Sequence, residues 1–516
     1  MNNSESETHW VRYDKWALAL LLLVGFLIRF EGIGLDLIDH HCFREGTEAM
    51  MARHFAREGI FLQYPKIDGY SAEPLLFINE FPLYPALMAF CYRIAIEHVL
   101  FGRLISVAAS LGSALVCYLL LRRMSRNTTP VWGTALFILS PLGSYVGRCV
   151  MRHPTAFFFM ILSFYLWILW LQKPMWRFWF GALFSGALSI LMNFANAYIG
   201  LPMLCALVLI RGVKGFFDRR VWLLAGLMLF PSVLWLKHAM EFGAWFMTGE
   251  GGVKQRDLGR FIRLEWLNSD FFESVGSHLS TMLLTPLGCF LAFVGLLIAW
   301  RSPLAWIARV WALTVIIYFG FDHYPIYMHV HDYYFVHALF PACLAFGLAG
   351  GAMVEIAGLK SPRFPHVGAS IASVVLGLLL LASWVVYDRP LKKQFLHTEV
   401  GWLQHWLPAS RGVRELTDPD AILVVDRDVD ALIYLCDRRG WVTDWKELTP
   451  EALESMVRHG ADYLLITSYT MGEKGAFTGF DFYDPEKGSP AAGWVQSHGK
   501  VIKDGLVYQI VDLAPS

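Results

Sequence analysis

The residues most suited to chemistry lie in one short stretch that follows the first long apolar run of the chain. Within positions 36–48 the sequence gathers four carboxylates, two histidines and an arginine: Asp36, Asp39, His40, His41, Arg44, Glu45 and Glu48. Transfer of a sugar to a hydroxyl or an amine needs a carboxylate that accepts the acceptor's proton while the anomeric carbon gains oxocarbenium character. We therefore predict that one of Glu45, Asp39 and Glu48 is catalytic. The alternative is a solvated loop whose acids simply begin a helix.

Two further segments carry polar groups beside apolar runs. Glu80 stands ahead of Pro82, at the expected start of a helix, and either faces a substrate or complements the helix dipole. Positions 322–334 are rich in histidine, aspartate and tyrosine. From this segment we predict substrate contacts for His331, Asp332 and Tyr333, although an aromatic belt at the membrane interface would also explain the tyrosines.

Metal binding is an open alternative for the 322–334 segment. The side chains of His329, His331 and Asp332 are of the type that binds a divalent cation, but the spacing is not that of a metalloprotease helix. Hydrogen bonding to a phosphate or a sugar is the interpretation we favour. No metal site is therefore predicted.

Basic residues form the fourth group. Lys254 and Arg256 begin a series at near-helical spacing, and such a stripe suits a phosphate or diphosphate headgroup. The alternative is a surface helix with ion pairs to Asp257 and Glu265. Arg152, at the end of another apolar run, is a similar candidate for substrate binding.

The composition indicates an integral membrane protein. Hydrophobic residues make up 56% of the 516 positions and charged residues only 17%, against about 45–50% and about 25% in soluble domains. The net charge is zero, which argues against a nucleic-acid partner. The eight cysteines show no CxxC or Cys/His metal spacing.

Apolar runs of suitable length predict about eleven membrane-spanning helices. The run from Pro82 to Leu100 is ambiguous, but treating it as an interfacial helix places the basic loops on the cytoplasmic side. The N-terminus is then cytoplasmic. The predicted spans are 16–33, 104–121, 130–147, 154–172, 178–194, 196–211, 221–239, 280–299, 304–320, 333–356 and 367–387.

The predicted organisation is a membrane domain, residues 1–390, and a small extracytoplasmic α/β domain, residues 391–516. The membrane domain would have outer loops at 34–103, 240–279 and 321–332. In the α/β domain we predict strands at 421–425 and 462–467, a helix at 450–459, and a third strand at 501–511.

Several motifs in order resemble one family. They are His41–Phe55, Glu80–Tyr84, Gly102–Ser106, His331–Tyr334 leading into Pro341, and in the tail Tyr434–Trp441 with Gly460–Leu465. The chain resembles a bacterial member of the protein O-mannosyltransferase and aminoarabinose-transferase superfamily, the polytopic type C glycosyltransferases. One departure is clear: this family commonly has an Asp-Glu pair or a lone Asp where this chain has Arg44-Glu45. Glu45 is the nearest positional match, and Asp39, Asp36 and Glu48 are displaced alternatives.

The resemblance implies an all-α polytopic enzyme of the bacterial cytoplasmic membrane, active on its extracytoplasmic side. It would move a sugar, with inversion, from a polyprenyl-phosphate donor to a glycan, lipid or protein acceptor. The donor phosphate would be neutralised by Arg44, Lys254 and Arg256. Relatives differ in metal dependence, so no cofactor is implied with certainty. A transporter or flippase of lipid-linked sugars is the alternative, but it would predict charges near the middle of the spans.

Overall fold

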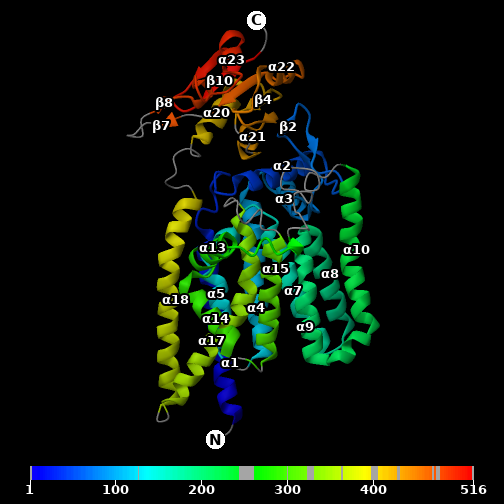
Figure 1. The fold of residues 1–516 in the computed structure, drawn as a ribbon, viewed down its shortest axis with the longest axis vertical. Helices are drawn as coiled ribbons and strands as arrows, with labels where there is room; N and C mark the ends of the chain where they lie inside the picture. Colours follow the sequence, from blue (N-terminus) through cyan, green and yellow to red (C-terminus); the bar gives the residue numbers. More distant parts are fainter. Residues whose placement is uncertain are drawn as a thin grey trace. The chain divides into compact units, whose positions relative to one another are not determined.

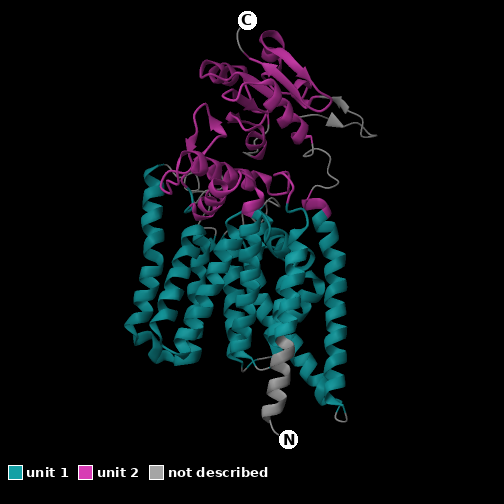
Figure 2. Ribbon diagram, turned by 180° about the vertical axis from the view of Figure 1, so that it is seen from behind, with its two compact units in different colours: residues 1–33, 79–81, 103–392 teal, residues 34–78, 82–102, 393–516 magenta. Residues whose placement is uncertain are grey.

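The protein is described here by a computed structural model, in which the chain folds as two compact units (Figure 2). Unit 1 consists of residues 1–33, 79–81 and 103–392, and unit 2 of residues 34–78, 82–102 and 393–516. The described residues are 3–125, 127–242, 261–298, 300, 302–321, 331–361, 364–396, 405–426, 430–467, 470–471 and 477–513.

The regular elements described in unit 1 are helices, and its long helices run alongside one another (Figure 1). From the N-terminus they are α1 (Asn3–Phe30), α4 (Leu100–Met124), α5 (Thr129–Ile138), α6 (Pro141–Val146), α7 (His153–Gln172), α8 (Trp176–Met192), η1 (Phe194–Ile199), α9 (Gly200–Arg211), η2 (Val213–Phe217) and α10 (Arg219–Glu241). After residue 260 follow α13 (Ser269–Ser277), η3 (His278–Leu283), α14 (Thr285–Ile298), α15 (Pro303–Phe321), η4 (Asp332–Ala338), α17 (Leu339–Leu359) and α18 (Pro365–Phe395).

Seven of these helical stretches are long and apolar enough to cross a membrane, counted over the described residues. An eighth is added if the pair Ser269–Leu283 and Thr285–Ile298, bent by 111°, is one span. The bend falls at Thr285, which has a left-handed φ of 65°. Two shorter apolar helices, α5 and α8, and the N-terminal α1 overlap the remaining predicted spans. The predicted span 130–147 is not one helix, because it contains the two short helices α5 and α6, and the predicted span 280–299 crosses the bend at Thr285.

Small residues let the helices of unit 1 approach closely. A Cβ on Gly295 of α14 would lie 1.8 Å from the Ala345 carbonyl oxygen of α17. A Cβ on Gly347 of α17 would lie 2.7 Å from the Thr129 carbonyl oxygen of α5. Helix α7 is central, with 67% of its apolar window buried, whereas α18 has only 17% buried. The apolar side chains of α18 therefore face outward, as expected for a lipid-facing span.

Unit 2 combines residues of the first loop with the C-terminal part of the chain. Its helices are α2 (Cys42–Glu58), α3 (Leu83–Ile94), α20 (Trp406–Leu416), α21 (Asp430–Cys436), α22 (Pro450–Arg458), η5 (Asp481–Tyr483) and α23 (Ala492–His498). Its strands are β1 (Lys66–Ile67), β2 (Tyr70–Ser71), β3 (Leu75–Leu76), β4 (Ile422–Val425), β5 (Arg439–Val442), β6 (Tyr463–Ile466), β7 (Thr470–Met471), β8 (Phe477–Gly479), β9 (Lys500–Asp504) and β10 (Gln509–Asp512). The first outer loop thus folds with the C-terminal residues.

A six-stranded sheet in the order β2-β5-β4-β6-β10-β9 forms the centre of unit 2. Strand β4 is parallel to both β5 and β6, while the outer pairs are antiparallel. The apolar side chains of Val424, Leu464 and Val511 enter one buried core with Leu453 of α22. The predicted strands at 421–425 and 462–467 correspond to β4 and β6.

Unit 2 departs from the prediction at residues 501–511, and it also contains the ambiguous run from Pro82 to Leu100. The single strand predicted at 501–511 is wrong, because the chain turns at Gly505, whose N–H bonds to the Tyr508 carbonyl, and forms the hairpin β9–β10. The ambiguous run from Pro82 to Leu100 contains α3, a helix of 12 residues. This helix is too short to cross a bilayer, which needs about 20 residues.

Candidate active site

The first-loop carboxylates lie where the loop enters α2. Asp39, Glu45 and His41 are each 0% exposed, and Glu48 is 1% exposed. Asp36, by contrast, is exposed. The loop turns into the helix through backbone bonds from the Cys42 N–H to the Asp39 carbonyl (2.9 Å) and from the Glu45 N–H to the His41 carbonyl (3.0 Å).

The charges of two of the carboxylates act on the thiol of Cys42. Burial raises the pKa of Cys42, and the negative charges of Glu45 and Asp39 raise it further. Glu45 is in the first turn of α2, where a helix dipole favours a negative charge. That effect is typically about 0.3–1 kcal/mol. It does not account for burying three carboxylates, since each loses several kcal/mol of hydration.

The histidines of the loop are held by Phe395, at the end of α18. The His40 N–H bonds to the Phe395 carbonyl at 2.8 Å, and the two rings stack with centroids 4.1 Å apart. The His41 ring contacts His40 edge-on at 4.7 Å. Arg44 is half-buried on the first turn of α2. The loop that carries the predicted catalytic residues is therefore held at its two histidines by Phe395.

Glu80 belongs to unit 1, in which it pairs with Arg152. The Arg152 Nη2 and Glu80 Oε1 atoms are 2.5 Å apart, and the side chains are only 7% and 18% exposed. Neighbouring contacts hold the tripeptide 79–81 in place, since Trp235 Nε1 donates to the Asn79 carbonyl at 2.8 Å and the Phe81 ring contacts Trp235 at 5.0 Å. Two residues that were predicted separately as substrate contacts are thus brought together.

The segment 331–333 lies beside the start of α7. Asp332 and Tyr333 are both 2% exposed. The His331 Nδ1 is 3.0 Å from the Tyr333 hydroxyl, and the Tyr333 ring lies 4.6 Å from the ring of His153. His329 lies outside the described residues. The contact between His153 and Tyr333 was not predicted, because no local pattern links residues that far apart in the sequence.

A pocket in unit 1 borders this group. It lies between α4, α6, α7 and the segment η4–α17. Its lining combines polar side chains with apolar ones: Ser110, Ser113, Phe137, Gly143, Val146, Gly147, His153, Pro154, Phe157, Asn193, Tyr333, Val336, His337 and Leu339. Of the polar residues, Asn193 also caps η1 by accepting from the Ala195 N–H at 3.2 Å.

Two buried arginines lie near the end of α1. Arg103, 0% exposed, donates to the Ile33 carbonyl at 3.1 Å, and Arg148, 1% exposed, donates to the Gly32 carbonyl at 3.0 Å. Both guanidinium groups thereby satisfy carbonyls beyond the end of a helix. Their position beside polar loops was visible in the sequence, but their burial was not.

Only part of the predicted basic stripe lies within the described residues. Lys254 and Arg256 lie outside the described residues. Arg263 is described and pairs with Glu265 through a contact of 2.6 Å between side chains that are 60% and 47% exposed. This pair agrees with the alternative interpretation of a salt-bridged surface segment, at least for Arg263.

The fold of the chain is that of type C glycosyltransferases of known structure. ArnT from Cupriavidus metallidurans bound to undecaprenyl phosphate is similar over 99% of both chains, with a TM-score of 0.60 and 14% identity. An oligosaccharyltransferase, AglB from Archaeoglobus fulgidus in complex with an inhibitory peptide and a dolichol-phosphate, is similar over 96% of this chain and 80% of its own. Its TM-score is 0.58 and its identity 11%.

Residues 79–236 match the family model described as dolichyl-phosphate-mannose-protein mannosyltransferase. No curated protein sequence matches the chain. The family model and the structural matches support the superfamily that the sequence resemblance indicated. The predicted fold class, a polytopic helical membrane protein with a C-terminal region that contains strands, is confirmed.

Proposed function

We propose that this protein is an inverting glycosyltransferase that uses a polyprenyl-phosphate-linked sugar as its donor. The acceptor would be a glycan, a lipid or a protein at the outer face of the bacterial cytoplasmic membrane. Support for the donor comes from the family model and from two structural relatives whose complexes contain undecaprenyl phosphate and dolichol-phosphate. Support for the outer face comes from the basic loops, which the positive-inside rule assigns to the cytoplasm.

One observation carries the proposal: Asp39, Glu45 and Glu48 are buried together with His41 where the first loop enters α2. Buried ionisable groups are expensive for stability and cluster at functional sites. A structural role alone would be served equally well by apolar side chains of similar volume.

The proposed reaction is a single displacement at the anomeric carbon. The acceptor oxygen or nitrogen forms a bond to this carbon while the bond from the carbon to the donor phosphate oxygen breaks. The polyprenyl phosphate leaves with the electron pair. A carboxylate takes the proton of the acceptor, and we assign this role to Glu45 or Asp39, with Glu48 as the remaining alternative.

Other residues would bind the substrates. Arg44 suits the phosphate of the leaving group, because a guanidinium binds phosphate oxygens bidentately. Lys254 and Arg256, outside the described residues, keep the same proposed role. A further group, which would contact the sugar or the acceptor, consists of Asp36, His41, Glu80, Arg152, His331, Asp332 and Tyr333.

A divalent cation is the alternative means of neutralising the donor phosphate. A second structure of the Archaeoglobus fulgidus oligosaccharyltransferase is a complex with Zn and sulfate, similar to 95% of this chain with a TM-score of 0.58 and 12% identity. Turnover after treatment with EDTA, with and without added Mg²⁺, Mn²⁺ or Zn²⁺, decides between the two. Activity that survives the chelator assigns the neutralisation to arginine and lysine alone.

The function is tested with purified protein, a panel of polyprenyl-phosphate hexoses and pentoses, and mass spectrometry of the acceptors. We expect transfer from one donor, and a loss of about 10²–10⁴-fold in kcat when the catalytic carboxylate is replaced in Glu45→Gln or Asp39→Asn. Glu58→Gln is the matched control, since Glu58 is a 42% exposed carboxylate on the same helix.

Two outcomes would contradict the proposal. Movement of intact lipid-linked sugar across vesicles, with no transfer from any donor, would identify a flippase instead. Full activity of both Glu45→Gln and Asp39→Asn would show that the base is not one of these two residues.

A further inference from the structure

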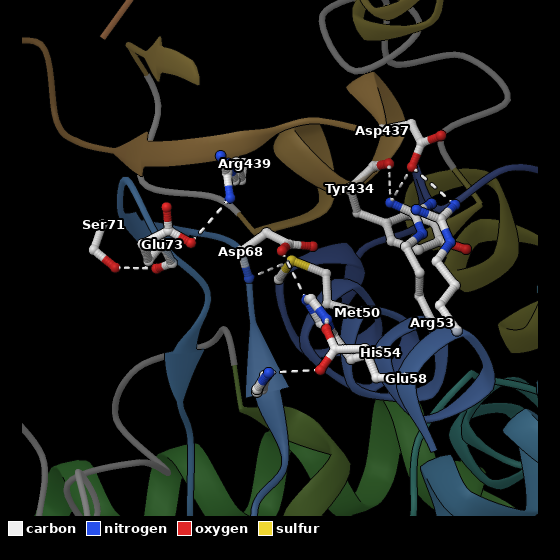
Figure 3. A network of polar contacts seen from close by, with 12 residues as sticks. Met50, Arg53, His54, Glu58, Asp68, Ser71, Glu73, Tyr434, Asp437 and Arg439 are labelled. Carbon is white, nitrogen blue, oxygen red and sulfur yellow. Dashed lines mark hydrogen bonds and ion pairs between the residues drawn. The ribbon is translucent and has the colours of Figure 1, made fainter. Parts of the chain in front are cut away.

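Arg53, in the second half of α2, joins three distant parts of unit 2. Its Nε contacts Glu97 Oε1 at 2.7 Å. Its Nη1 contacts Asp437 Oδ1 at 3.0 Å, and Figure 3 shows Arg53 beside Asp437 and Tyr434. The same Nη1 donates to the Tyr434 carbonyl at 3.2 Å, and the guanidinium lies 3.9 Å from the centre of the Tyr434 ring. The Arg53 side chain is only 8% exposed, whereas the side chains of Glu97 and Asp437 are 28% and 42% exposed.

A second arginine, one turn further along α2, doubles the connection. Arg57 contacts Glu97 and Asp437, each at 3.2 Å, although its side chain is 53% exposed. Burial acts to raise the pKa of Asp437, but Arg53 and Arg57 outweigh it and lower the pKa. Asp437 is thus a carboxylate held by two arginines of one helix face.

The backbone at Asp437 is left-handed, with a φ of 51°. Glycine, Asn and Asp adopt this region more often than other residues do. Asp437 follows the last residue of α21 directly, and its N–H bonds to the Tyr434 carbonyl at 3.0 Å. This turn presents the Asp437 carboxylate to Arg53 and Arg57 of α2.

Helix α2 also carries Glu45 and Glu48, two of the three candidate carboxylates of the proposed reaction. Glu45 precedes Arg53 by eight positions, which corresponds to about 12 Å along the helix axis. Because the helix is a stiff rod, a shift or rotation at Arg53 moves Glu45 as well. A displacement of about 1 Å at a reacting group can cost about 10²-fold in rate.

We propose that Arg53 is a positioning residue: its contacts with Glu97, Tyr434 and Asp437 fix the place of α2 and thereby of Glu45. This inference rests on the proposed function. On this inference, Tyr434 and Asp437 in the C-terminal part of unit 2 affect the rate of transfer although they do not contact the reacting atoms. Arg53 acts on the rate of transfer through Glu45 and does not act on binding of the donor.

The test compares the steady-state kinetics of Arg53→Lys with those of the full-length wild-type protein. Lysine keeps the charge but loses the planar fork that reaches Glu97 and Asp437 together. We expect kcat to fall at least about 10-fold while the KM for the donor stays within about 2-fold. The matched control is Arg439→Lys, because Arg439 pairs with Glu73 at 3.0 Å on the surface of the same unit. This control should leave both constants unchanged.

A double-mutant cycle separates positioning from a merely structural role. In the background of Glu45→Gln, adding Arg53→Lys should change the residual kcat by less than about 2-fold, because the group that it positions is already inactive. An equal loss in both backgrounds would overturn the inference, and so would a wild-type kcat for Arg53→Lys. If Arg53→Lys fails to fold, Asp437→Asn takes its place, since Asn tolerates the left-handed conformation and removes only the charge.

The outcomes also distinguish this inference from the proposed function. If the wild-type protein transfers no sugar, the proposed function fails before Arg53 is tested. If the wild-type protein is active and Glu45→Gln is not, while Arg53→Lys is unaffected, only the positioning role fails.

Discussion

Replacing Glu80 with glutamine should destabilise the protein far more than replacing an exposed glutamate. The ion pair between Glu80 and Arg152 has a contact of 2.5 Å and side chains that are 18% and 7% exposed. Glutamine keeps the shape of Glu80 but removes the charge that faces the guanidinium. Removing one partner of a buried pair costs about 3–5 kcal/mol. Because Glu80 retains some exposure, we expect the lower end, about 3 kcal/mol.

The free energy of unfolding in mixed detergent micelles, titrated with sodium dodecyl sulfate, measures this effect. The matched control is Glu73→Gln, because Glu73 also pairs with an arginine, at 3.0 Å, but with side chains that are 77% and 35% exposed. Exposed pairs contribute about 0–1 kcal/mol. Equal losses in the two variants would refute the conclusion that burial makes the Glu80 pair important.

Two further predictions concern stability. Burial would lower the pKa of His54, but its hydrogen bonds to Asp68 (2.7 Å) and Glu58 (2.8 Å) raise it. The resulting stabilisation should be full below about pH 6.5 and be lost as pH rises through the folded-state pKa. His54→Gln should flatten that part of the pH profile of unfolding, and an unchanged profile would contradict the assignment. In unit 1, Gly295→Ala should cost at least about 1–3 kcal/mol, since its Cβ would meet a backbone carbonyl at 1.8 Å. Gly226→Ala, with nothing within 4 Å of its Cβ, should stabilise α10 by up to about 1 kcal/mol. The thermal midpoints of the two variants are compared with that of the wild-type protein. A Gly295→Ala midpoint no lower than that of Gly226→Ala would contradict the prediction and show that α14 and α17 move apart to accept the methyl group.

The membrane-spanning helices could be predicted from sequence because their signal is local. An apolar run of about 20 residues identifies a span wherever it packs. Strands β4 and β6 were also predicted, because each is a continuous apolar segment. The hairpin β9–β10 was missed, since alternation along 501–511 hid the turn at Gly505.

The site was less predictable because its contacts join distant residues. Glu80 and Arg152 were each recognised as polar residues beside apolar runs, but their pairing was not. Strand β2 has two residues and no recognisable pattern, yet Tyr70 pairs with Trp441 at the edge of the sheet. The choice among Asp39, Glu45 and Glu48 stays a prediction, because all three are buried alike.

The contact between Arg53 and Tyr434 has a consequence for the order of assembly during biosynthesis. The two residues are 381 positions apart in the chain. At about 5–20 residues per second, the ribosome needs about 20–80 s to produce Tyr434 after Arg53. Throughout that interval, Arg53 and Arg57 lack Asp437, and strand β2 lacks its partner β5. The first loop therefore lacks its contacts with the C-terminal residues until these are synthesised. A chain truncated before residue 434 never forms these contacts.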